Sequence, residues 1–355
     1  MTTTGDQGTA QAFMEKVLGD FSAAGVGALC VLGDRLDLFK NLDAAGPATS
    51  DELAERTGLN ERYLREWLSG LACAGYLTYD TESRRFILPP EHAQVLATES
   101  TPLSLGFAFQ YLPPIFGVVD TIEHAFRHGG GVPMSAYDRR MFDTQERETA
   151  AVYDQMLVQR WLPTMPDVQA LLERGADVAD IGCGRARALI NLARAFPASR
   201  YTGYDAFPLN VREATARVTA ADLADRVRIE ERDVAQGLPM QFDVITSFDV
   251  VHDAVDPLGM LQAIQWALRP GGRYVAVEPG IAERLEDNLG LLGTLFYTSS
   301  LFYCMTVSLA EGGAGLGTAG LPESKLRELC AQAGFSDVRR MPIEDPFHTV
   351  YEIIP

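Results

Sequence analysis

The chain has 355 residues, of which 47% are hydrophobic and 22% are charged, a composition typical of folded globular domains. Its length predicts more than one domain and enough apolar material for a substantial core. The formal net charge of −18 argues against nucleic acid as a partner, because nucleic-acid binders usually carry a basic face. These properties favour a cytoplasmic enzyme.

The five cysteines predict neither a disulfide framework nor a zinc site, because their number is odd and no two form a CxxC pair. Such cysteine usage is typical of a reducing compartment. The polar segment Met1–Gln11 has no basic region followed by an apolar one, so no signal peptide is expected.

Residues 13–38 are predicted to form a helix in a first domain that spans residues 1–95. Phe13, Val17 and Phe21 have the spacing of one helix face, and a glycine-interrupted apolar run follows them. A helix this apolar has little reason to exist on a monomer. We therefore expect a homodimer built through residues 12–40 and the elements that follow.

Those elements are predicted to form a winged helix. Thr49 and Glu52 make a capping box at the start of one helix, and Asn60 caps a second. Residues 76–79 and 85–88 then resemble the two strands of a short hairpin. Two helices followed by a hairpin are the elements of a winged helix.

A winged helix can bind DNA, but the charge of this one argues against it. Five acidic and three basic side chains lie between Asp51 and Glu66, which is unfavourable for phosphate contact. We expect a structural or dimerisation role. A cofactor-sensing transcriptional regulator is the alternative.

Residues 96–172 are predicted to be a largely helical segment with a flexible break at Gly129–Pro133. Strands and helices then alternate over residues 173–355, which predicts a Rossmann-like α/β domain with a seven-stranded, mostly parallel sheet. The expected strands are Asp177–Ile181, Arg200–Tyr204, Val227–Glu231, Asp243–Ser247, Tyr274–Val277, Val338–Pro342 and Thr349–Ile354.

Chemically apt groups follow the strands of this domain. Asp180, Gly182 and Gly184 form a DxGxG turn after the first strand, where glycines let backbone pass close to a ligand. Asp205 ends the second strand, and a carboxylate there can accept hydrogen bonds from ribose hydroxyls. Since ligands of open α/β sheets bind beyond the carboxyl ends of the strands, the turn and Asp205 belong to one predicted site.

The next two strands contribute further groups to the same edge. Asp233 and Val234 follow the third strand, where they could contact the edge and face of an adenine. Phe248 and Asp249 end the fourth strand. A dehydrogenase would need GxGxxG, but Arg187 stands at the third glycine position.

The DxGxG turn resembles motif I of class I methyltransferases, which implies S-adenosylmethionine as the cofactor. In that family the acidic residue after strand two binds the ribose, a role that falls on Asp205 with Ala206 beside it. The pair that frames the adenine corresponds to Asp233 and Val234. The family often has a further glycine where this chain has Ala186.

A winged helix before a class I domain resembles the small-molecule O-methyltransferases and the α-keto-acid C-methyltransferases, which dimerise through that domain. The likeness is closest to a bacterial subgroup with this layout. It is carried by Gly129–Pro133, Phe248–Pro257, Arg284–Asn288 and Ser308–Gly317.

His252 and Asp253 are the candidate catalytic residues. They follow the fourth strand, near the point where the family has a catalytic His–Asp pair, and an imidazole can take a proton near neutral pH. The expected substrate pocket is lined by Tyr111, Tyr153, Trp161, Tyr297, Tyr303 and His348. No metal is expected; the alternative is a site made by His252, Asp253, Glu278 and His348.

The predicted function is methyl transfer to oxygen or carbon of a small, aromatic or keto-acid-like molecule by in-line displacement, a reaction typical of secondary metabolism. Recruitment of the fold to non-methylating chemistry is a further alternative. The uncharged stretch Leu289–Ala310 is long enough to cross a membrane. Because predicted strands of one sheet flank it, we expect it to line the pocket instead.

Overall fold

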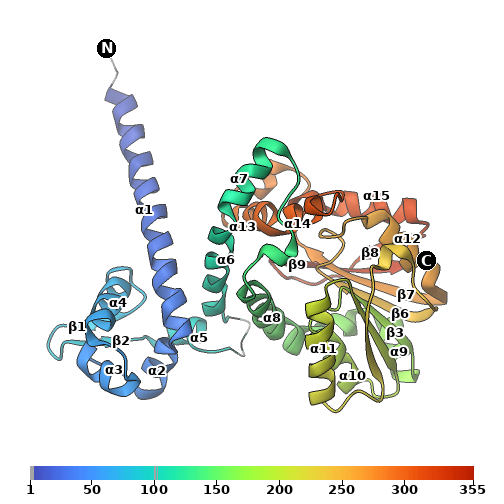
Figure 1. Ribbon diagram of the computed structural model, residues 1–355, viewed down its shortest axis with the longest axis horizontal. Coiled ribbons are helices and arrows are strands. Elements are labelled where there is room, and N and C mark those ends of the chain that lie inside the picture. The colour runs from blue at the N-terminus through green and yellow to red at the C-terminus, as the bar shows by residue number, and fades with distance from the viewer. Residues whose placement is uncertain (1–3, 100, 102) are drawn as a thin grey trace. The chain divides into compact units, whose positions relative to one another are not determined.

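The computed structural model describes residues 4–99, 101 and 103–355, so the expectation for Met1–Gln11 falls partly outside the described residues. The chain packs into two units, drawn in Figure 1. One comprises Met1–Pro114 and Arg140–Ala151, and the other comprises Ile115–Arg139 and Val152–Pro355. The segment predicted between residues 96 and 172 is thus divided between the two units.

The first unit is helical with a small hairpin. Its helix α1 begins earlier than predicted and ends at Arg35 rather than residue 38, because Asp37 adopts a left-handed conformation with φ 52° that starts the next helix. Its elements are α1 (Thr4–Arg35), α2 (Leu38–Ala45), α3 (Ser50–Thr57), α4 (Glu61–Cys73), β1 (Thr78–Asp80), β2 (Arg85–Ile87), α5 (Pro90–Leu96), η1 (Gly106–Tyr111) and most of α8 (Arg140–Val152).

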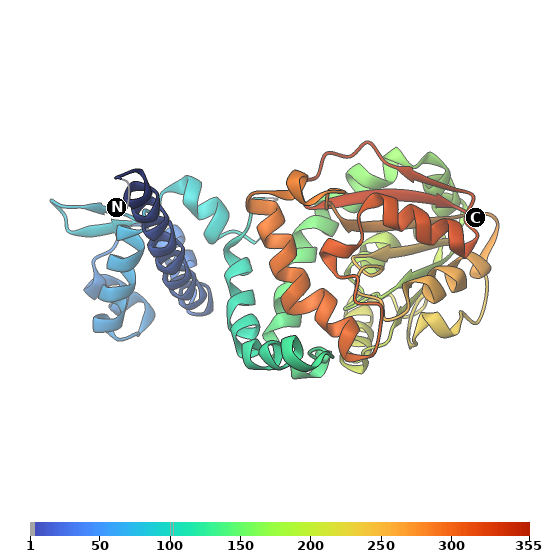
Figure 2. The ribbon, with the colours of Figure 1, turned by 90° about the horizontal axis from the view of Figure 1, so that it is seen from above.

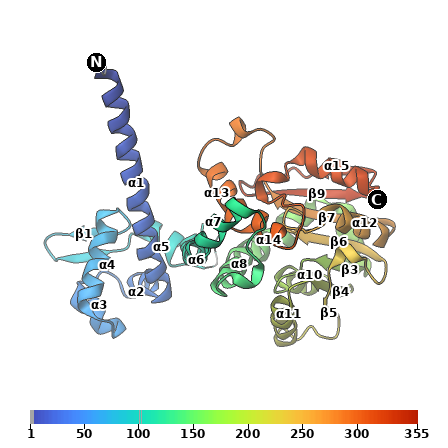
Figure 3. The same ribbon diagram turned by 45° about the horizontal axis from the view of Figure 1, so that its top comes forward.

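The predicted winged helix is confirmed within this unit. Thr49 Oγ1 accepts the Glu52 N–H at 3.2 Å, and Glu52 Oε2 accepts the Thr49 N–H at 2.9 Å, which completes the capping box of α3. Asn60 caps α4 through the Arg62 N–H at 3.0 Å. Strands β1 and β2 pair as the antiparallel hairpin that projects beside α4 in Figure 3.

The second unit is built on one seven-stranded sheet in the order β5-β4-β3-β6-β7-β9-β8. Strands β3 to β7 run parallel, whereas β9 is antiparallel to both of its neighbours. The predicted mostly parallel, Rossmann-like sheet is confirmed. Its strands are β3 (Asp177–Ile181), β4 (Arg200–Asp205), β5 (Val227–Glu231), β6 (Phe242–Phe248), β7 (Leu268–Pro279), β8 (Asp337–Arg340) and β9 (His348–Ile354).

Helices cover both faces of this sheet, as Figure 2 shows. One face packs against α9 (Pro166–Arg174), α10 (Arg187–Ala195) and α11 (Pro208–Ala220), and the other against α12 (Pro257–Ala267) and α15 (Glu323–Ala333). The remaining helical elements are α6 (Leu112–Gly117), α7 (Val119–His128), η2 (Met134–Ala136), η3 (Tyr153–Trp161), η4 (Leu162–Thr164), η5 (Val234–Gln236), η6 (Leu285–Asn288), α13 (Leu291–Ser299), η7 (Ser300–Cys304), α14 (Met305–Ala310) and η8 (Thr318–Gly320).

The strand order reverses between β3 and β6. The chain leaves β3 toward β4 on one side, and β6 later pairs with β3 on the other side. In open α/β sheets the crevice beyond the carboxyl ends of the strands at such a switch point binds the ligand. This topology makes the carboxyl edge of β3, β4 and β6 the place to look for a site.

Two helical segments, Thr9–Arg35 and Leu291–Ala310, are long and apolar enough to cross a membrane by length and composition alone. The second consists of α13, η7 and α14, and it is fastened to the sheet domain. Ser308 Oγ donates to the Ala254 carbonyl at 3.0 Å, and Thr306 O accepts the Val132 N–H at 3.2 Å. Such contacts are those of a helix packed within a folded domain.

Candidate active site

The turn after β3 has the backbone conformation that its glycines permit. Gly182 and Gly184 have φ of 64° and 52°. A Cβ on Gly182 would lie 2.6 Å from Val250 Cγ2, whereas a Cβ on Gly184 would meet nothing within 4 Å. Backbone at Gly184 therefore borders open space. Ala186, where the family often has glycine, also adopts a left-handed conformation with φ 63° at the start of α10.

Asp180 is buried beneath this turn, with a residue exposure of 1%. Thr246 Oγ1 of the adjacent strand β6 donates to Asp180 Oδ1 at 2.7 Å. Burial raises the pKa of Asp180 to about 7. A cationic ligand near this carboxyl group would favour its ionised form.

Asp205 at the end of β4 holds the glycine turn. Its Oδ2 accepts the Gly184 N–H at 2.9 Å, and its Oδ1 accepts the Phe207 N–H at 2.8 Å. Asn210 Nδ2 lies 3.3 Å from both oxygens, so this contact is the weakest of the three. Burial raises the pKa of Asp205 to about 6, against the lowering effect of the two backbone donors. If a ligand displaced the Asn210 side chain, each carboxylate oxygen of Asp205 could accept one further hydrogen bond.

The residues predicted to contact the adenine and ribose differ in their exposure. Asp233 is exposed and caps η5 through the Ala235 N–H at 3.1 Å. The Val234 side chain is buried in the core on the α12 face of the sheet. Ala206, which follows β4, is exposed.

Asp249 and His348 meet beyond the end of β6. Asp249 has φ 57°, and its Oδ2 lies 3.4 Å from His348 Nε2. His348 begins β9, where it pairs in register with Pro279 of β7. Burial alone would lower the pKa of His348, but Asp249 and Asp345 raise it to about 10. Burial would likewise raise the pKa of Asp249, and the charge of His348 lowers it instead.

His252 is held between two carboxylates just past β6. Its Nδ1 lies 2.6 Å from Glu278 Oε2, and its Nε2 lies 3.1 Å from Asp253 Oδ1. Glu278, the next-to-last residue of β7, is 1% exposed, and its Oε1 accepts the Val251 N–H at 2.9 Å. Burial would lower the pKa of His252, but Asp253 and Cys304 raise it well above the ordinary value. A fixed Nδ1–H···Glu278 bond directs Nε2 toward Asp253.

Cys304 adds a thiol to this pair. The ligand atoms of His252, Asp253 and Cys304 lie within 4.8 Å of one another, and Thr318 Oγ1 donates to Cys304 Sγ at 3.1 Å. Burial and the Asp253 carboxylate raise the pKa of Cys304 to about 11. Nitrogen, oxygen and sulfur donors are a set that zinc accepts. The predicted set of His252, Asp253, Glu278 and His348 does not form such a group, and His348 contacts Asp249.

Two π-helices contribute several of the predicted pocket residues. Tyr153 and Trp161 lie on η3, and their rings approach Phe248 and His348 with centroid distances of 5.1 and 6.3 Å. Tyr303 lies on η7, beside Cys304. Helical segments of this type are rare and are frequent at functional sites.

The other two aromatic residues lie elsewhere. Tyr297 is 42% exposed on α13. Tyr111 belongs to the first unit, where its hydroxyl group donates to the Glu148 carboxylate. The structure thus gathers Tyr153, Trp161, Phe248, Asp249 and His348 in one cluster.

Sequence reasoning assigned no positioning role to the groups that hold the candidate residues. Glu278 could have been recognised, because it is next to last in a parallel strand, at the same edge as His252. Thr246 could have been placed opposite Asp180 once the strands were aligned. Cys304, Asp345 and Asn210 carry no comparable signal, since each lies on a helix or loop whose docking the pattern does not specify.

Comparisons with known proteins agree with both halves of this architecture. Residues 24–98 match the sequence model of the Rv2258c-like winged helix-turn-helix domain, and residues 179–274 match that of a methyltransferase domain. The mitomycin biosynthesis 6-O-methyltransferase of Streptomyces lavendulae is 26% identical over 303 residues, which cover 84% of this chain and 82% of that protein.

Solved structures share the fold over nearly the whole chain. The mitomycin 7-O-methyltransferase superposes with a TM-score of 0.71 at 23% identity, covering 99% of each chain. Human N-acetylserotonin methyltransferase gives a TM-score of 0.69 at 19% identity, covering 96% of this chain and 97% of its own. The chain is a class I S-adenosylmethionine-dependent methyltransferase with an N-terminal winged-helix domain.

Proposed function

We propose that this enzyme methylates a hydroxyl oxygen of a small secondary metabolite at the carboxyl edge of β3, β4, β6 and β7. The observation that carries this proposal is the buried Glu278–His252 pair, joined at 2.6 Å, next to the glycine turn. The similarity to an O-methyltransferase over 84% of the chain supports oxygen as the acceptor. A cytoplasmic location suits this function.

The cofactor-binding roles follow from the chemistry of each group. Backbone at Gly182 and Gly184 would let the cofactor approach the turn, and Asp180 would favour its positive charge. Asp205 would accept the ribose hydroxyls where Asn210 now donates weakly. Ala206 and Asp233 would border the adenine, whereas Val234 could contribute only its backbone because its side chain is buried in the core. Phe248 and Asp249 would border the methionine end.

S-adenosylmethionine, when bound, supplies an electrophilic methyl group attached to a sulfonium. His252 would take the proton of the substrate hydroxyl at Nε2 while Glu278 holds Nδ1–H and fixes the tautomer. Asp253 would stabilise the resulting imidazolium. Substrate alignment would account for most of the remaining rate, because in-line attack requires a narrow approach geometry.

Methyl transfer from radiolabelled cofactor to a panel of hydroxylated aromatic compounds tests this function directly. Product formation that requires both cofactor and protein supports it. A gel shift with DNA at physiological salt, in the absence of turnover with any acceptor, would favour the regulator alternative.

Asp253→Asn is expected to shift the pH profile of turnover. The neutral form of His252 is the base, so activity should rise with pH through the pKa of His252, above the ordinary imidazole value. Removal of the Asp253 charge lowers that pKa, so the acidic limb should move to lower pH. Turnover measured across pH 5 to 10, at saturating cofactor, checks this. An unmoved limb would assign it to another group.

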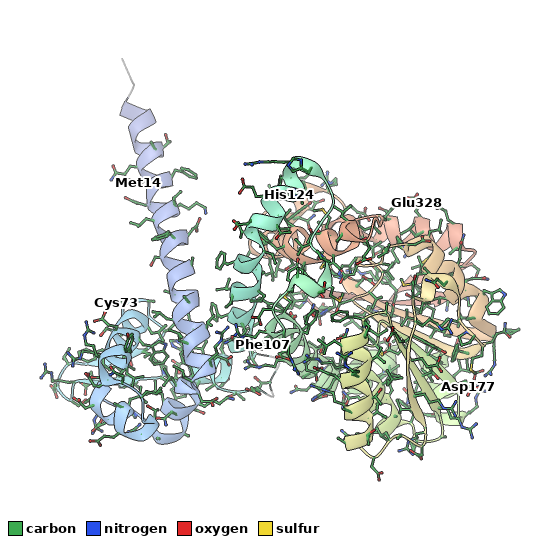
Figure 4. All side chains as sticks on the ribbon, in the orientation of Figure 1. Met14, Cys73, Phe107, His124, Asp177 and Glu328 are labelled. Atoms are coloured by element: carbon green, nitrogen blue, oxygen red, sulfur yellow. The ribbon has the colours of Figure 1, made fainter. Side chains whose placement is uncertain are left out.

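The apolar face of α1 favours a homodimer. Phe13 and Phe21 are 65% and 78% exposed, and Met14, labelled in Figure 4, projects from the same helix with 61% exposure. Burial of such side chains against a second copy is favourable, at about 25 cal/mol per Å² of apolar surface.

Light scattering at micromolar concentration should therefore give twice the chain mass, and Phe21→Glu should give a monomer. Phe126→Glu, at a position that is 74% exposed on α7 of the second unit, is a matched control for the added charge. A monomeric wild-type protein would rule out the dimer.

A further inference from the structure

Trp161 carries a buried hydrogen-bond donor that the proposed mechanism does not use. The residue is 1% exposed, and within the described part of the chain its Nε1 has no hydrogen-bond partner. The indole N–H can only donate, and a buried donor left unpaired costs about 1–3 kcal/mol. Native proteins seldom retain such a group without a purpose.

The other two tryptophans show how this chain ordinarily treats the indole group. Trp67 Nε1 donates to the Leu29 carbonyl at 2.8 Å, and Trp266 is 62% exposed to solvent. The chain holds three tryptophans in all, so Trp161 alone has a buried indole N–H without an acceptor.

His348 supplies a second donor close to the first. The Trp161 and His348 rings have a centroid distance of 6.3 Å. His348 Nδ1 is buried and, among the described residues, has no hydrogen-bond partner; Asp345 Oδ1 lies 3.4 Å away. That oxygen already accepts the backbone N–H groups of Phe347 and His348 at 2.8 and 3.0 Å. Neighbouring rings thus carry two buried donors, neither of which has a hydrogen-bond partner among the described residues.

The charges around His348 restrict what the acceptor can be. Asp249 and Asp345 flank the imidazolium, so the three groups together carry a net charge of −1. A carboxylate would be repelled by this arrangement, whereas a neutral carbonyl oxygen would not. Phe248 and Tyr153, whose rings are 5.1 Å apart, add flat apolar surface beside it.

We propose that Trp161 Nε1–H and His348 Nδ1–H bind a carbonyl oxygen of the substrate. The substrate class is therefore an aromatic or conjugated ketone or quinone that also bears the hydroxyl group to be methylated, rather than a keto acid. This inference rests on the proposed function. His348 directly precedes Thr349, which pairs with Glu278. One donor of the carbonyl site and the carboxylate that holds the base therefore lie on the neighbouring strands β9 and β7.

Indole ¹⁵N–¹H spectra test this with internal controls, because the protein gives three indole signals. In the presence of S-adenosylhomocysteine, 4′-hydroxyacetophenone should move the Trp161 signal downfield, whereas 4-ethylphenol, which has CH₂ in place of the carbonyl, should not. The Trp67 and Trp266 signals should stay in place. Wild-type protein should bind the ketone about five- to tenfold more tightly than 4-ethylphenol, from the value of one buried hydrogen bond.

Trp161→Phe should remove the signal and lower the preference for the ketone, because only the His348 donor remains. If this variant folds poorly, Trp266→Phe identifies the signal of the exposed indole and Trp67→Phe that of the hydrogen-bonded indole. The remaining signal is then that of Trp161, and the titration of the wild-type protein is sufficient. Equal responses to the two compounds, or none, would overturn the inference, as would a Trp161 signal already downfield from a bound water. Calorimetry of S-adenosylhomocysteine on the same samples separates the two claims: retained binding without ketone preference refutes only the carbonyl site, whereas absent binding refutes the proposed function.

Discussion

His252→Ala is expected to lower methyl transfer about 10²–10⁴-fold, the usual contribution of a general base. The affinity for S-adenosylhomocysteine should remain nearly unchanged, because the His252 ring is held by Glu278 and Asp253 rather than by the glycine turn. Single-turnover rates with labelled cofactor, together with calorimetry of S-adenosylhomocysteine, measure the two quantities separately.

His124→Ala is a matched control, since His124 is exposed on α7 and should leave both quantities unchanged. A loss of thermal stability with normal turnover per folded molecule would make His252 a structural residue. Wild-type turnover that is abolished by a chelator and restored by a divalent metal would make His252, Asp253 and Cys304 a metal site instead.

Asp205→Ala should weaken S-adenosylhomocysteine binding by roughly 1.5–3 kcal/mol, or about 10- to 150-fold, because hydrogen bonds to a charged group are lost. The same substitution releases the Gly184 N–H, which Asp205 holds at 2.9 Å, so the glycine turn loses a support as well. Isothermal titration calorimetry gives the change directly.

Two matched variants sharpen this measurement. Asp225→Ala removes an exposed carboxylate before β5 and should leave affinity unchanged. Asn210→Ala removes only the weak contacts at 3.3 Å and should leave affinity unchanged or slightly improved, because the ribose no longer competes with the amide. Unchanged affinity for S-adenosylhomocysteine in Asp205→Ala would show that Asp205 does not bind the ribose. Tight binding of NAD would show that the cofactor is not S-adenosylmethionine.

The sheet could be predicted from sequence because its strands are short apolar runs with polar groups at their ends. Four of the five parallel strands have the predicted bounds to within one residue at each end, whereas β7 begins at Leu268 rather than residue 274. The difference arises because Leu268 pairs with Phe242 before the register shifts at Val244. A local pattern carries no information on such a shift.

The candidate site is easiest to predict where it depends on strand ends. Topology alone brings the carboxyl edges of parallel strands together, which indicates Asp180, Asp205, His252 and Asp249. Cys304 lies on a π-helix within an apolar segment, and its approach to His252 depends on how that segment docks. The division of residues 96–172 between two units depends on docking as well.

The two π-helices and the strand ends contribute different parts of the candidate site. His252, Asp249, Glu278 and His348 are anchored by the sheet and the turns that leave it, whose positions the core determines. Tyr153, Trp161 and Tyr303 belong to helices packed around that frame. Substitutions of the helical residues could therefore change which metabolite is accepted without affecting proton removal. Duplicated copies of such a gene could then diverge toward new natural products without first losing activity.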